Sequence, residues 1–182
     1  MIELQFRFAK DGCRDSPSRQ DAAFHAMKAA HEERLHRFCL RLCAGSVEDA
    51  NDLLQETWLA AFKSLPRFQS RAKLTTWLFR IAVFRWRQMR PAHRPLSEPD
   101  IEAEAIIDSS LRDTATSTIN RIALEDALKT LPETLRESFL LVKAEQFTHR
   151  EAAAILEIPQ GTVQARVHEA VRRLRHLLNE AE

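Results

Sequence analysis

The chain has 182 residues, 45% hydrophobic and 29% charged, with a formal net charge of +1 at pH 7. This globular balance accommodates one medium domain or two small ones. Only three glycines occur, and apolar residues recur every three to four positions instead of alternating with polar ones, so the sequence predicts an all-helical protein. No apolar run approaches the roughly 20 residues that cross a bilayer. Residues 1–20 carry charges and lack the apolar core of a secretory signal, so we expect a cytoplasmic protein.

Glycine and serine mark the boundary between the first two predicted helices. After an N-terminal tail of residues 1–20, a helix over 21–43 is expected to end at Gly45, because glycine readily takes the left-handed conformation that terminates a helix. Ser46 is placed to cap a second helix over 46–65, which ends before a proline.

The second predicted helix has two chemically different faces. On a helical wheel its buried face carries five apolar residues: Ala50, Leu54, Trp58, Ala61 and Leu65. The opposite face carries Asp52, Gln55, Glu56 and Leu59. A lone exposed leucine is normal. A leucine bordered by acids fits a docking surface for a basic partner helix as well as an ordinary solvated face.

The third helix, expected over 74–90, combines arginines and aromatic residues on its outer face. Two apolar stripes would pack in the core: Leu78, Ile81, Ala82 and Met89 beside Phe79, Val83 and Trp86. The remaining face shows Trp77, Arg80, Phe84, Arg87 and Gln88, and residues 63–94 contain nine Lys or Arg and no acid. This pattern suits single-stranded DNA, because bases stack on rings while guanidinium groups bind phosphates. The alternative is that Trp77 and Phe84 belong to the core of a helical bundle.

An acidic, proline-containing segment follows. Residues 95–118 contain six acids and one arginine, so we expect a flexible linker between a domain over 21–94 and a domain over 119–182. Basic surfaces on both sides of an acidic connector are typical of a chain that contacts a polyanion at two places.

The second domain ends in a helix-turn-helix pattern over residues 148–178. Thr148 and Glu151 have the spacing of a capping box, and Glu157 occupies the turn position that glycine often fills, at a cost of about 1 kcal/mol. Thr162 is placed to cap the second helix. The packed side of that helix would carry Val163, Val167, Ala170, Val171 and Leu174, and its outer side Gln164, Ala165, Arg166, His168 and Arg172. Such a motif offers its second helix to the major groove of DNA; the alternative is an ordinary helical hairpin with a basic face.

Several segments in register resemble the extracytoplasmic-function (ECF) sigma factors of bacterial RNA polymerase, within the sigma-70 superfamily. They are DANDLLQETWLAAFKSLPRF (49–68), LTTWLFRIA (74–82), LPETLRESFLL (131–141) and REAAAILEIPQGTVQARVHEA (150–170). The resemblance covers residues 24–178. It implies two small helical domains, sigma region 2 over 21–94 and sigma region 4 over 119–182. It also implies an initiation subunit, not an enzyme, that directs core RNA polymerase to promoter DNA and opens it.

The resemblance further implies roles for matching residues. Binding to core RNA polymerase would use Asp49, Asp52, Gln55, Glu56, Trp58 and Leu59. Recognition and melting of the −10 element, with its single strand, would use Phe68, Arg71, Lys73, Trp77, Arg80, Phe84 and Arg87. Recognition of the −35 duplex would use His149, Arg150, Thr162, Gln164, Arg166, His168 and Arg172. An anti-sigma factor is an expected partner that can hold such a protein at the inner face of the membrane. No cofactor, metal or small-molecule substrate is expected.

Some positions depart from the family pattern. Phe84 stands where the melting helix tends to have Asn, and Ser70-Arg71 replaces a Gly-Asp pair in the preceding loop, which makes the loop more basic. Three positions of the helix after the turn also differ: Gln164, Ala165 and Glu169. Glu169 beside a phosphate would repel DNA unless it accepts a hydrogen bond from a cytosine amine, so the −35 sequence preference stays open.

Other classes of protein fit parts of the sequence. A free-standing helix-turn-helix repressor or activator needs only the second domain, and leaves the acidic helix and the basic aromatic helix unexplained. Three cysteines argue against a disulfide framework, although Cys39, Cys43, His36 and Cys13 allow thiol or zinc chemistry; packing of small residues in a helix explains Cys39 and Cys43 more simply. An enzyme has the least support, because the sequence contains neither a glycine-rich phosphate loop nor HExxH spacing.

Overall fold

The computed structural model describes residues 17–68, 73–90 and 118–179, and every element within these ranges is helical. The first group comprises α2 (Pro17–Leu42), α3 (Val47–Ser64), the 3-10 turn η2 (Leu65–Arg67) and α4 (Leu74–Met89). The second group comprises α5 (Thr118–Thr130), α6 (Glu133–Phe139), the π-helical turn η3 (Leu140–Ala144), α7 (His149–Leu156) and α8 (Gln160–Asn179). The predicted all-α fold is confirmed. Within the described ranges, no helix combines the length and apolarity needed to cross a bilayer.

The corner between α2 and α3 forms as its sequence predicts. Gly45 has φ of +87°, and the Ser46 hydroxyl accepts a hydrogen bond from the Asp49 backbone N–H at 3.4 Å. These contacts satisfy backbone groups that a helix end leaves unpaired. At the other end of α3, Pro66 lies inside η2, because proline is tolerated in a first helical turn where no N–H is needed.

The core of the first group contains most of the predicted apolar positions. Those fully buried are Ala50, Trp58, Ala61, Leu78, Phe79, Ala82, Val83 and Trp86, with Leu54, Leu65 and Ile81 half-buried. Thr57 also enters this core, where its hydroxyl donates to the Leu53 carbonyl at 2.7 Å. The prediction that Met89 is a core residue is wrong: it is 41% exposed. It is the last residue of α4, so no further turn of the helix covers it.

The second group contains the predicted helix-turn-helix in α7 and α8. Thr148 and Glu151 form a reciprocal capping box, and Glu157 adopts the left-handed conformation with φ of 60°. The prediction that Thr162 caps the second helix is wrong, because α8 begins directly after Pro159 and Thr162 lies inside its first turn. All five residues predicted on the packed side of α8 are buried: Val163, Val167, Ala170, Val171 and Leu174.

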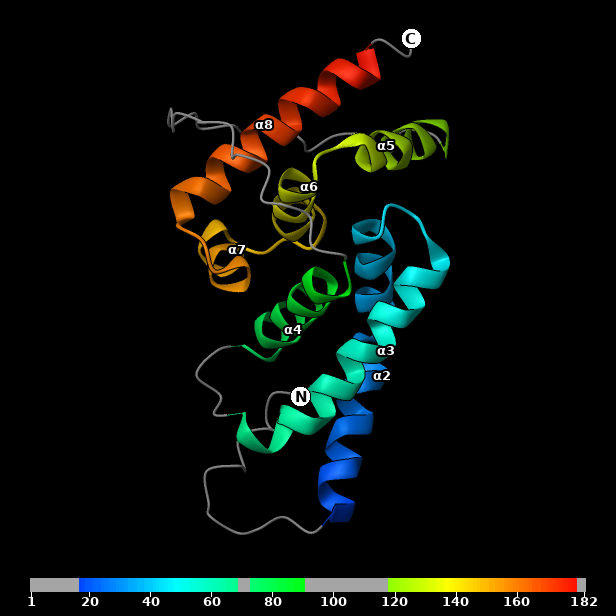
Figure 1. Cartoon of the computed structure of the whole chain (residues 1–182), viewed down its shortest axis with the longest axis vertical. Coiled ribbons are helices and arrows are strands. Elements are labelled where there is room, and N and C mark those ends of the chain that lie inside the picture. The colour runs from blue at the N-terminus through cyan, green and yellow to red at the C-terminus, as the bar shows by residue number, and fades with distance from the viewer. Residues whose placement is uncertain (1–16, 69–72, 91–117, 180–182) are drawn as a thin grey trace.

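The two helical groups share one continuous hydrophobic core. Figure 1 shows α2 and α3 in the lower part of the molecule, the second group in the upper part, and α4 between them. Helix α4 contacts α7, Phe79 stacks edge-on against Phe147 at 5.1 Å, and Arg34 pairs with Glu145 at 2.7 Å. The domain limits at 21–94 and 119–182 stay a prediction, and the predicted linker up to residue 117 lies outside the described residues.

Candidate polymerase and nucleic-acid interfaces

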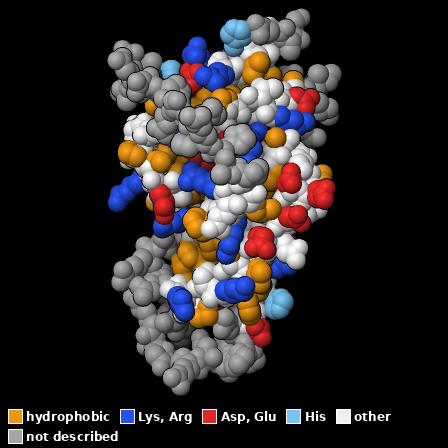
Figure 2. Space-filling model, in the orientation of Figure 1, with side chains coloured by type: hydrophobic (Ala, Val, Ile, Leu, Met, Phe, Trp, Pro, Cys, Tyr) orange, Lys and Arg blue, Asp and Glu red, His pale blue; other side chains and the backbone are white. Residues whose placement is uncertain are grey.

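The outer face of α3 combines carboxylates with exposed apolar side chains. All the predicted polar docking residues are exposed: Asp49, Asp52, Gln55 and Glu56. Leu59 and Phe62 are exposed large hydrophobic residues on the same helix. Figure 2 shows acidic side chains gathered over α3 at the right of the view. The face therefore presents negative charge beside apolar surface, which suits a partner that is basic and partly apolar.

Trp58 does not belong to this exposed face. Its indole is buried and packs edge-on against Phe24 at 5.9 Å, while Phe24 also contacts Phe62 at 5.0 Å. In this structure Trp58 therefore supports the face from below, and its direct contact with core polymerase stays a prediction. The sequence reasoning missed Phe62, which a helical wheel places within one turn of Leu59 and beside Gln55.

The outer face of α4 carries aromatic surface, as expected. Phe84 is 56% exposed, so its assignment to a bundle core does not hold. Trp77 is half-buried against the core and its ring lies 4.9 Å from that of Phe68. Trp77 is therefore partly a core residue, as the alternative interpretation of a helical bundle predicts. Arg71 lies outside the described residues.

The cations along α4 are paired with carboxylates from the second helical group. We call Lys73, Arg80, Arg87 and Arg90 the cationic row and Glu133, Glu137, Glu151 and Glu157 the acidic row. The pairs are Lys73 with Glu151, Arg80 with Glu157, Arg87 with Glu137, and Arg90 with Glu133. Lys73, Arg80 and Arg87 are three of the residues predicted to bind −10 DNA. Nothing in the sequence pattern indicated this pairing.

Glu137 joins two arginines that were assigned to different DNA elements. Only 2% of the residue is exposed, and its carboxylate accepts from Arg87 Nη2 at 2.7 Å and lies 3.7 Å from Arg166 Nη1. Burial raises the pKa of Glu137, and the neighbouring guanidinium groups oppose this rise. The expectation that Arg166 points outward is wrong for this structure: it is 6% exposed, because its guanidinium turns inward to the buried carboxylate.

The remaining outer face of α8 stays open to solvent. Gln164, His168 and Arg172 are exposed, and Ala165 is half-buried. Glu169, expected to repel DNA, binds Arg172 at 2.7 Å and Arg173 at 2.6 Å. Hydrogen bonds from these arginines lower the pKa of Glu169 to about 2. Its charge is thus balanced by arginines of its own helix.

The start of α7 supplies the other residues predicted at the −35 element. Arg150 is exposed, whereas Thr162 in α8 is half-buried. Burial and the nearby Lys143 lower the pKa of His149, so its imidazole is neutral near pH 7.

The cysteines fit a packing role. Cys39 is fully buried in the core and Cys43 is half-buried. Burial raises the pKa of both thiols, that of Cys43 to about 11, so they stay protonated and weakly reactive near neutral pH. Among the described residues no cluster of His, Cys, Asp or Glu is arranged to hold a metal ion. Cys13 lies outside those residues.

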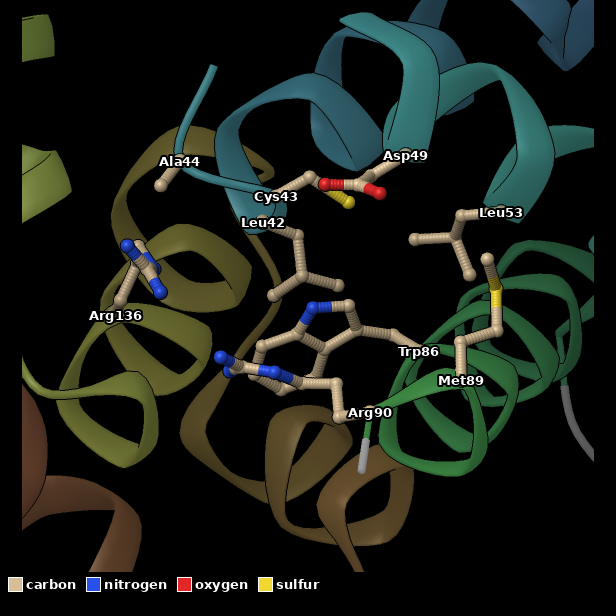
Figure 3. Close-up of a pocket in the computed structure, with 9 residues that line it drawn as sticks. All are labelled: Leu42, Cys43, Ala44, Asp49, Leu53, Trp86, Met89, Arg90 and Arg136. Carbon is tan, nitrogen blue, oxygen red and sulfur yellow. The ribbon is translucent and has the colours of Figure 1, made fainter. Parts of the chain in front are cut away.

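A cavity of about 300 Å³ lies where the two helical groups meet. Figure 3 shows Trp86 and Arg90, from α4 and the residue after it, next to each other on one wall, with Arg136 from α6 and Cys43 on other walls. Arg136 is buried, and burial together with Arg90 lowers its pKa. The boundary between the groups is therefore incompletely packed and brings two like charges together at this point.

Comparison with known proteins identifies both helical groups. The Sigma-70 region 2 family matches residues 27–94, and the Sigma-70, region 4 family matches residues 121–174. The chain is 33% identical to the ECF RNA polymerase sigma factor EcfG of Rhodopseudomonas palustris, covering 79% of this chain and 78% of that protein. It is 30% identical to the ECF RNA polymerase sigma-E factor of Haemophilus influenzae, covering 81% and 83%. The sigma factor RpoE of Bartonella quintana, solved with the anti-sigma factor NepR, matches with a TM-score of 0.67, 27% identity and coverage of 87% of this chain and 98% of that one.

Proposed function

The chain belongs to the ECF sigma factors of the sigma-70 family, and we propose that α3, α4 and α8 divide its work among polymerase binding, strand opening and duplex recognition. As a sigma factor it directs promoter-specific transcription initiation and is not itself an enzyme. Catalysis of RNA synthesis belongs to the polymerase it joins.

Region 2 binds core polymerase through the outer face of α3 in this proposal. The face offers Asp52 and Glu56 beside exposed Leu59 and Phe62, with the buried Trp58 holding its apolar part in place. Carboxylates that surround an apolar centre are what a basic, partly apolar helix of a partner would require.

Strand opening uses the outer face of α4 and the loop before it. The observation that carries this assignment is the exposed Phe84 between Arg80 and Arg87, which stay partly exposed in their ion pairs, with the Phe68–Trp77 ring pair at the start of the helix. Unstacked bases gain from aromatic surfaces, and guanidinium groups bind the strand's phosphates. A free-standing helix-turn-helix repressor has no use for such a face.

Region 4 reads the −35 duplex with the open side of α8. Gln164, His168 and Arg172 present donors to base edges, and the exposed Arg150 at the start of α7 lies where a phosphate contact would set the orientation of the motif. We assign Arg166 to the stability of region 4 and not to base contacts, because its guanidinium pairs with the buried Glu137.

An anti-sigma factor is the partner we propose beyond polymerase and DNA. The similar Bartonella quintana sigma factor was solved with one. We further propose a cytoplasmic location, with retention at the inner face of the membrane when that anti-sigma factor is tethered there.

Reconstituted transcription tests these assignments. Core polymerase is incubated with a genomic promoter library, with and without the chain, and transcripts are sequenced. Phe84→Ala is expected to bind polymerase and duplex normally but to open fewer promoters, whereas Arg172→Ala is expected to lose duplex −35 binding. If no transcript depends on the chain, the proposed function fails. If both variants fail only at duplex binding, the division between α4 and α8 is wrong.

A further inference from the structure

Helix α8 contains several arginines and a single acid, Glu169. Both carboxylate oxygens of Glu169 accept hydrogen bonds from Arg172: Nε donates to Oε2 at 2.7 Å, and Nη2 donates to Oε1 at 2.8 Å. Two parallel N–H···O bonds fix the plane of a guanidinium group as well as its position. The carboxylate therefore holds Arg172 in one orientation, although 67% of the arginine side chain is exposed.

Glu169 is itself held in place from its other side. Arg173, one turn further along α8, donates from Nε to Oε1 of Glu169 at 2.6 Å. Only 14% of the Glu169 side chain is exposed, whereas both partners of an ordinary surface pair, such as Lys129 and Asp126 on α5, are well exposed. Exposed pairs hold their side chains weakly, because both partners move and water competes with them. Arg172 is instead anchored to a largely covered carboxylate.

The anchored guanidinium keeps a second pair of donors for a ligand. Of its five N–H groups, one on Nε and one on Nη2 bind Glu169. The end-on edge, formed by Nη1 and the second N–H of Nη2, is left for other acceptors. Two adjacent donors of this kind match the N7 and O6 acceptors that guanine presents in the major groove.

Arg172 also lies in register with the other exposed residues of the helix. Gln164, His168 and Arg172 follow one another at intervals of four residues and are all exposed, so they share one face of α8. A long arginine side chain without an anchor can bind any nearby phosphate, and phosphate contacts carry no sequence information. An arginine with a fixed direction serves base recognition better than general attraction to DNA.

We propose that Glu169 is a positioning residue of the −35 interface: it directs Arg172 to the guanine of one G·C base pair and limits attraction to DNA of any other sequence. The inference deepens the proposed function and rests on it, because it assumes that α8 reads the −35 duplex. Its consequence is that Glu169 increases sequence selectivity while its negative charge lowers the affinity for DNA in general.

Four variants separate orientation from charge. Glu169→Gln removes the charge and leaves a side chain of the same size. Glu169→Asp keeps the charge but shortens the side chain by one methylene group, so the two-bond contact is lost. Arg172→Met removes the arginine itself. The matched control, Asp126→Asn, removes one carboxylate from the Lys129 pair on α5, whose partners are three residues apart like Glu169 and Arg172.

Base preference is measured on core polymerase loaded with each full-length variant. The holoenzyme selects from a duplex promoter library in which only the −35 region is randomised, and sequencing of the bound fraction gives the preference at every position. The affinity of the same holoenzyme for a promoter with a scrambled −35 region gives the attraction that does not depend on sequence.

We expect the original chain and Asp126→Asn to enrich guanine at one position. Glu169→Gln and Glu169→Asp should reduce this preference about 2- to 12-fold, the range for ordering one long side chain on binding, and Arg172→Met should reduce it at the same position. On the scrambled promoter Glu169→Gln should bind more tightly than the original chain, Glu169→Asp equally, and Arg172→Met more weakly. A purely structural role of Glu169 would instead weaken the preference at all positions together.

The proposal is overturned if no guanine enriched by the original chain depends on Arg172, or if the guanine preference of Glu169→Gln is as strong as that of Asp126→Asn. It is also overturned if Glu169→Gln weakens the preference at all positions equally. A failure of the proposed function has a different signature, because the original chain would then enrich no base at any position of the −35 region.

Discussion

The two helices proposed to contact the promoter, α4 and α8, carry similar cations that are neutralised in different ways. On α8, Arg172 and Arg173 bind Glu169, three and four residues away on the same helix. On α4, Arg80 and Arg87 bind acids that lie 77 and 50 residues away. Pairs within one helix do not depend on how the two helical groups pack, whereas the pairs of α4 exist only while the two groups are in contact.

The largest expected effect is a loss of stability, and it should distinguish the inner face of α4 from its outer face. Phe79 is fully buried against Phe38 and Phe147, so Phe79→Ala should lower the free energy of unfolding by about 3–5 kcal/mol. Phe84→Ala on the exposed side should change it by no more than about 0.5 kcal/mol, while weakening strand binding by roughly 1–3 kcal/mol. Urea unfolding and promoter-opening assays measure the two quantities. Equal destabilisation by both substitutions would mean that the outer face is packed.

The second prediction tests the arginine on α8 that faces inward. Arg166→Met leaves the buried Glu137 with Arg87 as its remaining close cation, so the free energy of unfolding should fall by about 1–3 kcal/mol. Arg172→Met, on the open side of the same helix, should leave unfolding almost unchanged. Urea unfolding of the two variants side by side gives the comparison. If Arg166→Met is as stable as the original chain but binds the −35 duplex more weakly, Arg166 contacts DNA and does not have a mainly structural role.

A third prediction concerns duplex binding by the open face. Arg172→Met should weaken binding of the −35 duplex by polymerase holoenzyme roughly 5- to 150-fold, the range for loss of one bidentate base contact. Binding of a single-stranded −10 oligonucleotide should be unaffected, because Arg172 lies outside the contact between α4 and the acidic row. Electrophoretic mobility shifts with each probe check both statements. A loss on both probes would remove the functional distinction between α4 and α8.

The smallest expected effect is a pH dependence from Glu169. Its pKa of about 2 in the folded state lies below the ordinary value of 4.5, so its stabilising contribution is present above pH 4.5 and is lost as pH falls towards 2. Glu169→Gln should therefore be less stable than the original chain at pH 5, and the difference should shrink as the pH is lowered. Thermal unfolding at a series of pH values measures this trend. A difference independent of pH would show that the Arg172 and Arg173 pairs do not stabilise the fold.

Local signals predicted the elements well. The left-handed Gly45, the Ser46 cap, the capping box of Thr148 with Glu151 and the left-handed Glu157 all form as expected. Each depends on residues within four positions of one another, which is the range over which helix geometry and capping act. The prediction of the buried side of α8 was correct for the same reason, because a strong 3.6-residue periodicity leaves only one apolar face to bury.

Helical wheels were less reliable at the edges of those faces. Arg166 borders the buried arc of α8, and whether it turns outward depends on the carboxylate of Glu137, which belongs to α6. Trp58 was placed both on the buried face of α3 and among the docking residues, and Phe24 of α2 completes its burial. A wheel gives the direction of a side chain from one helix axis and contains no information on what the neighbouring helices bring to that place.

The sequence by itself determined that the protein is helical, where the caps at Ser46 and Thr148 form, and that α4 combines cations with aromatic residues. The tertiary structure alone decided that those cations face Glu133, Glu137, Glu151 and Glu157. The physical reason is range: helix formation and capping act within a turn or two of the chain, whereas these ion pairs join residues 43 to 78 positions apart and exist only after the two regions have packed together.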